Sequence, residues 1–220
     1  TDGSKFFSSV LSFLAARADG TRVFFNTPEA IAGTGDTDNG FPDIFMASGG
    51  QIQLISDPAG YGTFYGASAD GSKVVFSNTD PTSGVVTLVV KDVVAGTSNL
   101  LTNSANPFEA CGVNTAGTRV LFATTAPLLA ADTDSDFDLY EWMGGTYRLI
   151  SGGKLNLPAI CKAASATGDR VWFTTKERLL PSDLDADTDT YERRVDGTLR
   201  LLAPNEHVVP NSSLNSLAVP

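Results

Sequence analysis

The chain has 220 residues and a formal net charge of −10. This acidic balance argues against nucleic acid as a partner and against docking onto an anionic membrane surface, because both need clustered Lys and Arg. Apolar residues make up 42% of the chain, enough for a folded core, and no run approaches the roughly 20 apolar residues of a membrane span, so we expect no membrane insertion.

One pattern, Gly-x-(Arg/Lys)-Val-x-Phe, recurs four times, as GTRVFF, GSKVVF, GTRVLF and GDRVWF. The four copies begin at Gly20, Gly71, Gly117 and Gly168. Because valine and phenylalanine lie two residues apart, they share one face of a strand, and the basic residue points the other way. The glycine and the residue before it predict a tight turn that leads into this strand.

Three further segments complete each repeat, so we expect four strands per repeat. A segment of small residues comes first, and a segment with an aromatic or β-branched core, a glycine turn and a short closing strand follow the Val/Phe strand. In chain order the first segments read SFLAARAD, FYGASAD, ACGVNTA and ICKAASAT, the third read DIFMA, TLVVKD, DLYEW and DTYER, and the closing strands read IQLIS, NLLT, YRLIS and LRLLA. No segment shows sustained helical periodicity, so we expect no helices.

A four-stranded unit repeated at this period predicts an all-β fold, a β-propeller of four four-stranded antiparallel blades. A β-sandwich is the alternative, but a sandwich does not need four near-identical units. We expect a single domain over residues 1–220, with extra N- and C-terminal segments. The expected blades are 10–56, 57–102, 103–151 and 152–203, and the tails are 1–9 and 204–220.

The repeats resemble those of the TolB-like (WD40-like) β-propeller family. The likeness rests on ASADGSKVVF and ARADGTRVFF, on DIF and DLY in the third strand, and on the closing LIS and LLT, and it covers residues 10–203. It implies the propeller fold and says little about activity, since such propellers bind peptides, proteins and sugars and some relatives are enzymes. The second repeat departs most, because TLVVKD lacks the acidic and aromatic residues of the others.

The four repeats do not include the two ends of the chain, and three interpretations of these ends are possible. The chain is part of a larger propeller, or a closed four-bladed ring with tails, or a ring whose tails pair as strands with a neighbouring subunit. An unpaired strand edge favours pairing with another chain, and head-to-tail donation that does not close makes a filament.

Three repeats carry an aspartate-rich loop before the third strand. The candidate metal ligands are Asp36, Asp38 and Asp43 in the first repeat, Asp132, Asp134 and Asp138 in the third, and Asp183, Asp185 and Asp189 in the fourth. Alternating carboxylates near one point suit Ca²⁺, which takes six to eight oxygen ligands. The alternative is that the aspartates cap turns by accepting backbone N–H groups.

Cysteine and histidine offer little catalytic chemistry here. Cys111 and Cys161 fall in the first segments of adjacent repeats, where a disulfide and two buried free thiols are both compatible with the sequence. His207 is the only histidine and lies in the C-terminal tail, so no Ser-His-Asp triad is expected.

These features favour a non-enzymatic, extracellular or cell-surface scaffold of bacterial type that acts through protein–protein contacts. Self-assembly into homo-oligomers or filaments through the terminal strands is the form we expect. A glycan- or peptide-binding module is the first alternative, and a metal-dependent hydrolase or lactonase is the second. We expect no catalytic residues and no cofactor beyond Ca²⁺.

Overall fold

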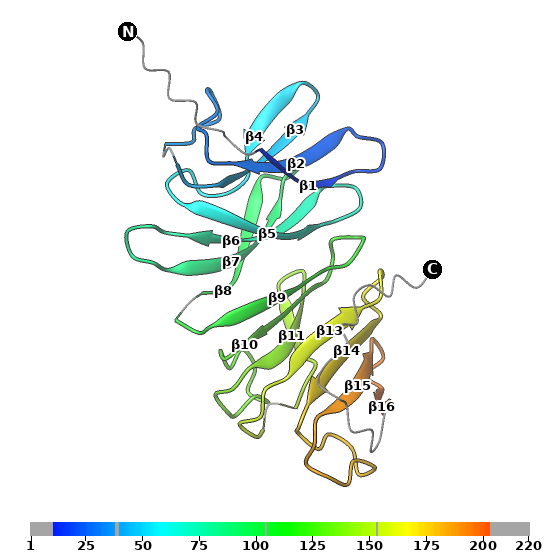
Figure 1. The fold of residues 1–220 in the computed structure, drawn as a ribbon. Coiled ribbons are helices and arrows are strands. Elements are labelled where there is room, and N and C mark those ends of the chain that lie inside the picture. The colour runs from blue at the N-terminus through cyan, green and yellow to red at the C-terminus, as the bar shows by residue number, and fades with distance from the viewer. Residues whose placement is uncertain (1–10, 38–39, 104, 153, 203–220) are drawn as a thin grey trace. The chain divides into compact units, whose positions relative to one another are not determined.

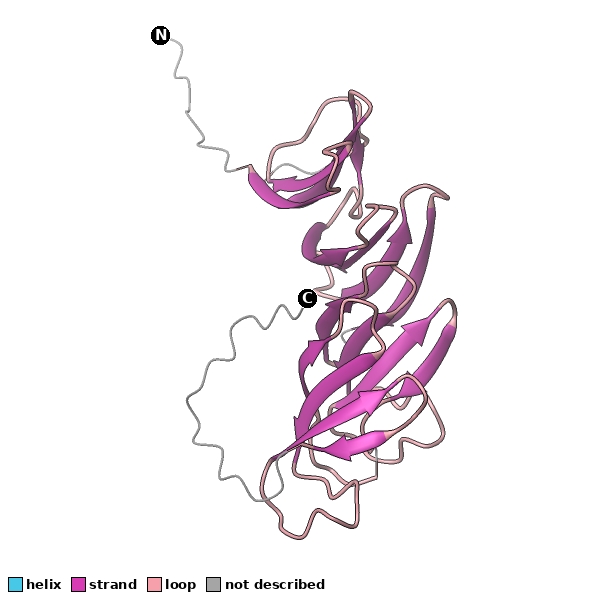
Figure 2. Cartoon of the chain, turned by 90° about the vertical axis from the view of Figure 1, so that its right-hand side faces the viewer, coloured by secondary structure: helices cyan, strands magenta, loops and turns pink. Residues whose placement is uncertain are grey.

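The computed structural model describes residues 11–37, 40–103, 105–152 and 154–202. They form sixteen β-strands in four four-stranded antiparallel sheets (Figure 1). The described residues contain no helix, so none of them forms an apolar helix that could cross a membrane (Figure 2). The four predicted four-stranded blades are confirmed. The chain divides into two compact units, Thr1–Ala105 and Asn106–Pro220, and its description as one domain stays a prediction.

The first unit contains blades 1 and 2. In each sheet the strands lie in chain order, β1-β2-β3-β4 and β5-β6-β7-β8. The strands of blade 1 are β1 (Ser12–Ala16), β2 (Arg22–Thr27), β3 (Asp43–Ser48) and β4 (Gln51–Leu54). Those of blade 2 are β5 (Tyr61–Ala67), β6 (Lys73–Thr79), β7 (Val86–Asp92) and β8 (Thr97–Asn103).

The second unit contains blades 3 and 4, again with strands in chain order. The strands of blade 3 are β9 (Phe108–Val113), β10 (Val120–Thr124), β11 (Asp138–Met143) and β12 (Thr146–Leu149). Those of blade 4 are β13 (Ile160–Ala164), β14 (Arg170–Thr175), β15 (Asp189–Arg194) and β16 (Leu199–Leu201).

The first strand of every blade contains a β-bulge at the same place. In each, one residue is skipped in the pairing with the second strand, and these residues are Leu14, Tyr65, Cys111 and Lys162. A bulge adds twist and turns the following side chains toward the other face. The bulge is therefore part of the repeat, although the sequence pattern did not predict it.

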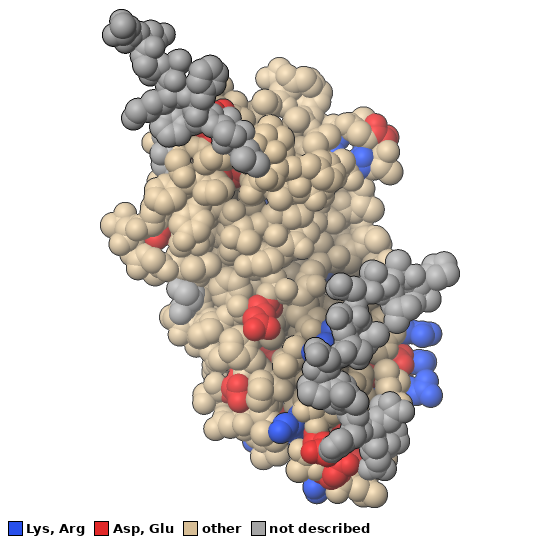
Figure 3. All heavy atoms as spheres, in the orientation of Figure 1, with Lys and Arg blue, Asp and Glu red and all other residues tan. Residues whose placement is uncertain are grey.

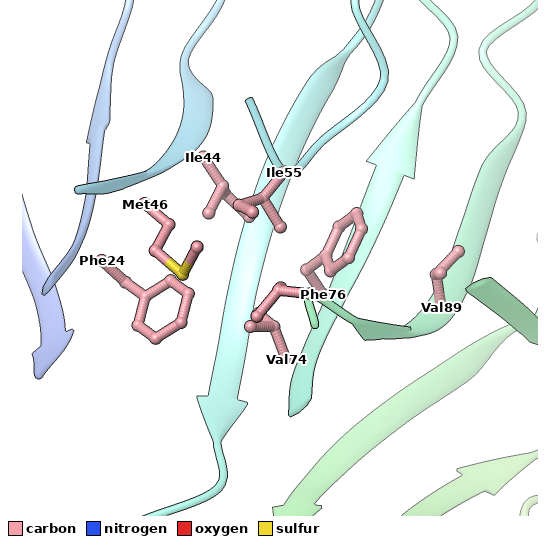
Figure 4. Packing of buried hydrophobic residues seen from close by; sticks show 8 residues of the cluster. Phe24, Ile44, Met46, Ile55, Val74, Phe76 and Val89 are labelled. Atoms are coloured by element: carbon pink, nitrogen blue, oxygen red, sulfur yellow. The ribbon is translucent and has the colours of Figure 1, made fainter. Parts of the chain in front are cut away.

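Blades 1 and 2 pack through opposite faces of their second strands. Phe24, on the face of β2 away from the repeat valine and phenylalanine, packs in one cluster with Val74 and Phe76 of β6. Ile44 and Met46 of β3 join this cluster, as Figure 4 shows. In unit 2 the same arrangement brings the β10 side chains of blade 3 against the valine and phenylalanine of β14. The Val/Phe face of the second and of the fourth repeat thus contacts the preceding blade of its unit.

Basic side chains add a polar seam between the paired blades. Arg22 donates to the Asp70 carbonyl of blade 2 at 2.7 Å, and Lys91 returns to the Ile55 carbonyl of blade 1 at 2.7 Å. In unit 2, Arg193 makes the equivalent return bond to the Ile150 carbonyl at 3.0 Å. Arg22 occupies the basic position of its repeat, whereas Lys91 and Arg193 lie on the third strands of their blades.

Candidate cation site in the acidic loops

The loop from β10 to β11 brings three aspartates of blade 3 together. One carboxylate oxygen from each of Asp132, Asp134 and Asp138, the blade-3 triad, lies within 4.8 Å of the others. The loop reaches this shape through short-range turns, in which the Asp134 N–H donates to Asp132 and the Asp136 N–H donates to Asp134 at 2.9 Å. Asp138 is held separately, because it begins β11 and pairs with Thr124.

Two hydroxyl groups that the sequence analysis did not single out hold the triad in place. The Tyr140 hydroxyl donates to Asp132, and the Ser151 hydroxyl donates to Asp138 at 2.5 Å. Ser151 also accepts the Leu139 N–H at 2.9 Å. Both residues belong to the repeat motifs, since Tyr140 is the tyrosine of DLY and Ser151 the serine of LIS, but the motifs indicate only that they lie in or beside strands.

Blade 4 repeats this geometry. Asp183, Asp185 and Asp189, the blade-4 triad, also have carboxylate oxygens within 4.8 Å of one another. The Tyr191 hydroxyl donates to Asp183, as Tyr140 does to Asp132. The Asp187 N–H donates to Asp185 at 2.9 Å. The structure therefore brings together six of the nine candidate ligands, in two groups of three.

Blades 1 and 2 differ from this arrangement. Asp43 begins β3 and accepts the Ser56 hydroxyl, as Asp138 accepts Ser151, and Asp36 is half-buried in the preceding loop. Asp38 lies outside the described residues. In blade 2, Asp80 accepts the Thr82 and Ser83 N–H groups at 2.8 and 3.2 Å. Asp80 therefore caps a turn, as the alternative interpretation of these aspartates expects.

Crowding and burial act on the protonation of both triads. Burial, together with the charges of Asp132, Asp134 and Glu177, raises the pKa of Asp138 to about 7 against the lowering effect of the Ser151 bond. Burial also raises the pKa of Asp189. At neutral pH such groups need either a proton or a cation to offset their repulsion.

The triads fit a hard cation chemically. Oxygens that share one Ca²⁺ at 2.3–2.6 Å lie no more than about 5.2 Å apart, and the 4.8 Å spread falls inside this limit. The short-range N–H bonds show that the aspartates also shape their turns, so the two roles coexist. Figure 3 shows acidic and basic side chains gathered over the part of the molecule where Figure 1 draws β9–β16.

The two thiols come from adjacent blades of unit 2. Cys111 is the bulge residue of β9 and Cys161 pairs with Phe173 in β13, and both pack on one apolar cluster. The bulge compensates for the one-residue offset between them in the repeat, so the side chains meet. Both are free thiols, and a hydrogen bond with Cys161, together with burial, raises the pKa of Cys111. A disulfide between them stays a prediction, and His207 lies outside the described residues.

Comparisons with known proteins identify the fold and leave the activity open. No family model matches the chain, and no curated protein matches it. Among solved structures, one from a study of two prolyl endopeptidases matches over 90% of this chain and 30% of its own, at 14% identity and a TM-score of 0.58. The tricorn protease matches over 81% of this chain and 17% of its own, at 13% identity and a TM-score of 0.50. TolB from Acinetobacter baumannii matches over 89% of this chain and 44% of its own, at 14% identity and a TM-score of 0.49.

The chain thus spans less than half the length of each of these three structures. At such low identity the likeness concerns the fold alone. The four four-stranded antiparallel sheets give the all-β propeller fold that the sequence motifs predict.

Proposed function

We propose that this chain is a non-enzymatic propeller scaffold that acts through protein–protein contact, and that the exposed edge of β1 is its contact surface. The observation that carries the proposal is an apolar edge. Leu11 and Phe13 are 61% and 67% exposed, and among the described residues β1 pairs with β2 alone. An edge strand presents unpaired N–H and C=O groups to another chain, and exposed apolar side chains add affinity to such pairing.

The symmetry of the charged groups supports a non-enzymatic role. In the described residues, the triads of blades 3 and 4 occupy matching positions. Glu141 and Glu192 also match, and each forms an ion pair with arginine, to Arg119 at 2.9 Å and to Arg194 at 2.8 Å. An active site would need convergent groups that break the repeat, whereas these groups follow it.

The partner we propose is a second copy of the chain, bound by strand addition in an extracellular or cell-surface setting. Acidic composition favours solubility over binding to nucleic acid. Extension of this contact into filaments would use the terminal segments 1–9 and 204–220, which lie outside the described residues.

One observation favours the alternative of a glycan- or peptide-binding module. Phe41 and Tyr61 stack with ring centroids 5.6 Å apart and an interplanar angle of 16°, and Phe41 is exposed. An exposed aromatic pair offers a flat apolar surface with one polar tip, which suits a sugar ring or a peptide side chain. Binding of oligosaccharides that Phe41→Ala abolishes would favour this alternative.

Sedimentation velocity over a range of protein concentrations tests the scaffold proposal. We expect the wild-type chain to form larger species as concentration rises, and the double variant Leu11→Ser/Phe13→Ser to stay monomeric. Val94→Ser is the matched control, because Val94 is 66% exposed but lies in the turn between β7 and β8. A wild-type chain that stays monomeric, or a double variant that associates like the control, would overturn the proposal.

A further inference from the structure

The two acidic triads of unit 2 are matched in sequence but differ in their surroundings. Asp138 is only 3% exposed, and its second carboxylate oxygen is buried without a hydrogen-bond partner among the described residues. The second carboxylate oxygen of Asp134 is likewise buried without a hydrogen-bond partner among the described residues. A buried, unpaired carboxylate oxygen is costly, so both oxygens are acceptors that point to a ligand.

A fourth carboxylate lies near the blade-3 triad, on the neighbouring blade. Glu177 follows β14 in blade 4, is 5% exposed, and its charge acts on Asp138. Gly152, next to Ser151, makes this approach possible, because a Cβ at that position would lie 1.8 Å from a Glu177 carboxylate oxygen. Because Gly152 has no side chain, the Glu177 carboxylate has room to lie near the blade-3 triad.

The blade-4 triad lacks these features in the described residues. None of its oxygens is among the buried atoms without a partner. The position that corresponds to Ser151 is Ala203 in the sequence, which has no hydroxyl.

We propose that the blade-3 triad binds one Ca²⁺ with Glu177 as an additional ligand, and that the ion joins blade 3 to blade 4. The blade-4 triad binds Ca²⁺ far more weakly, or not at all. Three aspartates and one glutamate offer up to eight oxygens, which suits the flexible coordination of Ca²⁺. Mg²⁺ fits less well, because it requires near-octahedral geometry and keeps several waters. This proposal does not depend on the scaffold function.

Calorimetric titration of the chelator-treated chain with CaCl₂, and with MgCl₂ for comparison, tests the proposal. We expect one Ca²⁺ per chain, bound at least tenfold more tightly than Mg²⁺. Asp138→Asn and Glu177→Gln should each weaken Ca²⁺ binding at least tenfold. Asp189→Asn is the matched control, and we expect it to leave the affinity unchanged within twofold.

Thermal unfolding provides the second readout and shows that the variants fold. Ca²⁺ should raise the melting temperature of the wild type and of Asp189→Asn, since a ligand that binds only the folded state stabilises it. It should leave the melting temperature of Asp138→Asn almost unchanged. Binding of no Ca²⁺ by the wild type would overturn the proposal. So would equal losses in Asp138→Asn and Asp189→Asn, and an unaltered affinity in Glu177→Gln would remove the link between the blades.

Discussion

Asp70 occupies the turn between β5 and β6, where short-range bonds favour its charged form. The Ser68 hydroxyl and the Ser72 N–H donate to it at 2.6 and 2.9 Å, and these bonds lower the pKa of Asp70 to about 2. A carboxyl whose pKa is lower in the folded state stabilises the fold above its unfolded-state pKa of about 3.9 and loses this effect as the pH falls toward 2.

Denaturant unfolding at pH 5 and at pH 2 measures this effect. We expect Asp70→Asn to be less stable than the wild type at pH 5 and to approach it at pH 2. A stability difference that stays the same at both pH values would show that the charge of Asp70 contributes nothing.

Cys111 and Cys161 give a second prediction at the level of single residues. Because the two thiols already share a hydrogen bond, we expect oxidised glutathione to convert them into a disulfide, with loss of both thiol hydrogens and reduction of glutathione disulfide to two thiols. The raised pKa of Cys111 should make the reaction slow at neutral pH and faster at alkaline pH, since the thiolate is the nucleophile.

The bridge would close a loop of about 50 residues and stabilise the fold by about 2–4 kcal/mol. Intact mass and a thermal melt after oxidation provide the measurement, and Cys111→Ser is the control. A mixed disulfide with glutathione, in place of an internal bridge, would show that the thiols cannot approach closely enough.

The sequence predicted the acidic residues but not the groups that position them. Repetition made the aspartates visible, because Asp138 and Asp189 occupy equal places in two repeats. Tyr140 and Ser151 belong to the same motifs, but the role of their hydroxyl groups could not be predicted. A strand pattern shows which face of the sheet a residue occupies and not which hydrogen bond its hydroxyl makes. The role of Glu177 could not be found, because the effect of its charge on Asp138 depends on how two blades pack.

At the scale of the strand and turn, the glycine of the repeat offers a matched pair. Gly20 and Gly71 both adopt positive φ, at 70° and 66°. A Cβ at Gly20 would have no atom within 4 Å, whereas one at Gly71 would lie 3.1 Å from the Arg22 side chain and 3.4 Å from Phe24. Arg22 cannot easily withdraw, because it donates to the Asp70 carbonyl.

We expect Gly20→Ala to cost about 1–2 kcal/mol of unfolding free energy, for its left-handed backbone alone. Gly71→Ala should cost a further ~1–3 kcal/mol through crowding at the seam between blades 1 and 2. Circular dichroism during denaturant unfolding provides both values. Equal losses in the two variants would mean that the seam adjusts without cost.

Strand number and order followed from the sequence, since turns and two-residue alternation recur in every repeat. The bulges did not, because Leu14, Tyr65, Cys111 and Lys162 share no residue type. What these residues share is their place before a run of small side chains, where the first strand must twist more strongly. Backbone geometry, rather than composition, sets the bulge.

At the scale of the whole molecule, the function we propose belongs to the exposed edge of the first repeat and not to a catalytic cluster. The repeats predicted four blades, and the aspartate triads of blades 3 and 4 follow the repeat. The chain is similar in fold to parts of longer solved structures, and this likeness says nothing of a shared partner. The exposed apolar side chains of Leu11, just before β1, and Phe13, within it, are the feature that separates the proposed scaffold from an inert module.

Hydrogen–deuterium exchange of the β1 segment, residues 12–16, at low and high protein concentration tests this claim most directly. If β1 adds to a strand of another copy, its amides should exchange more slowly as concentration rises, while those of the β7–β8 turn around Val94 keep their rates. Exchange in β1 that is independent of concentration, in a chain that nevertheless associates, would contradict the account and place the contact surface elsewhere.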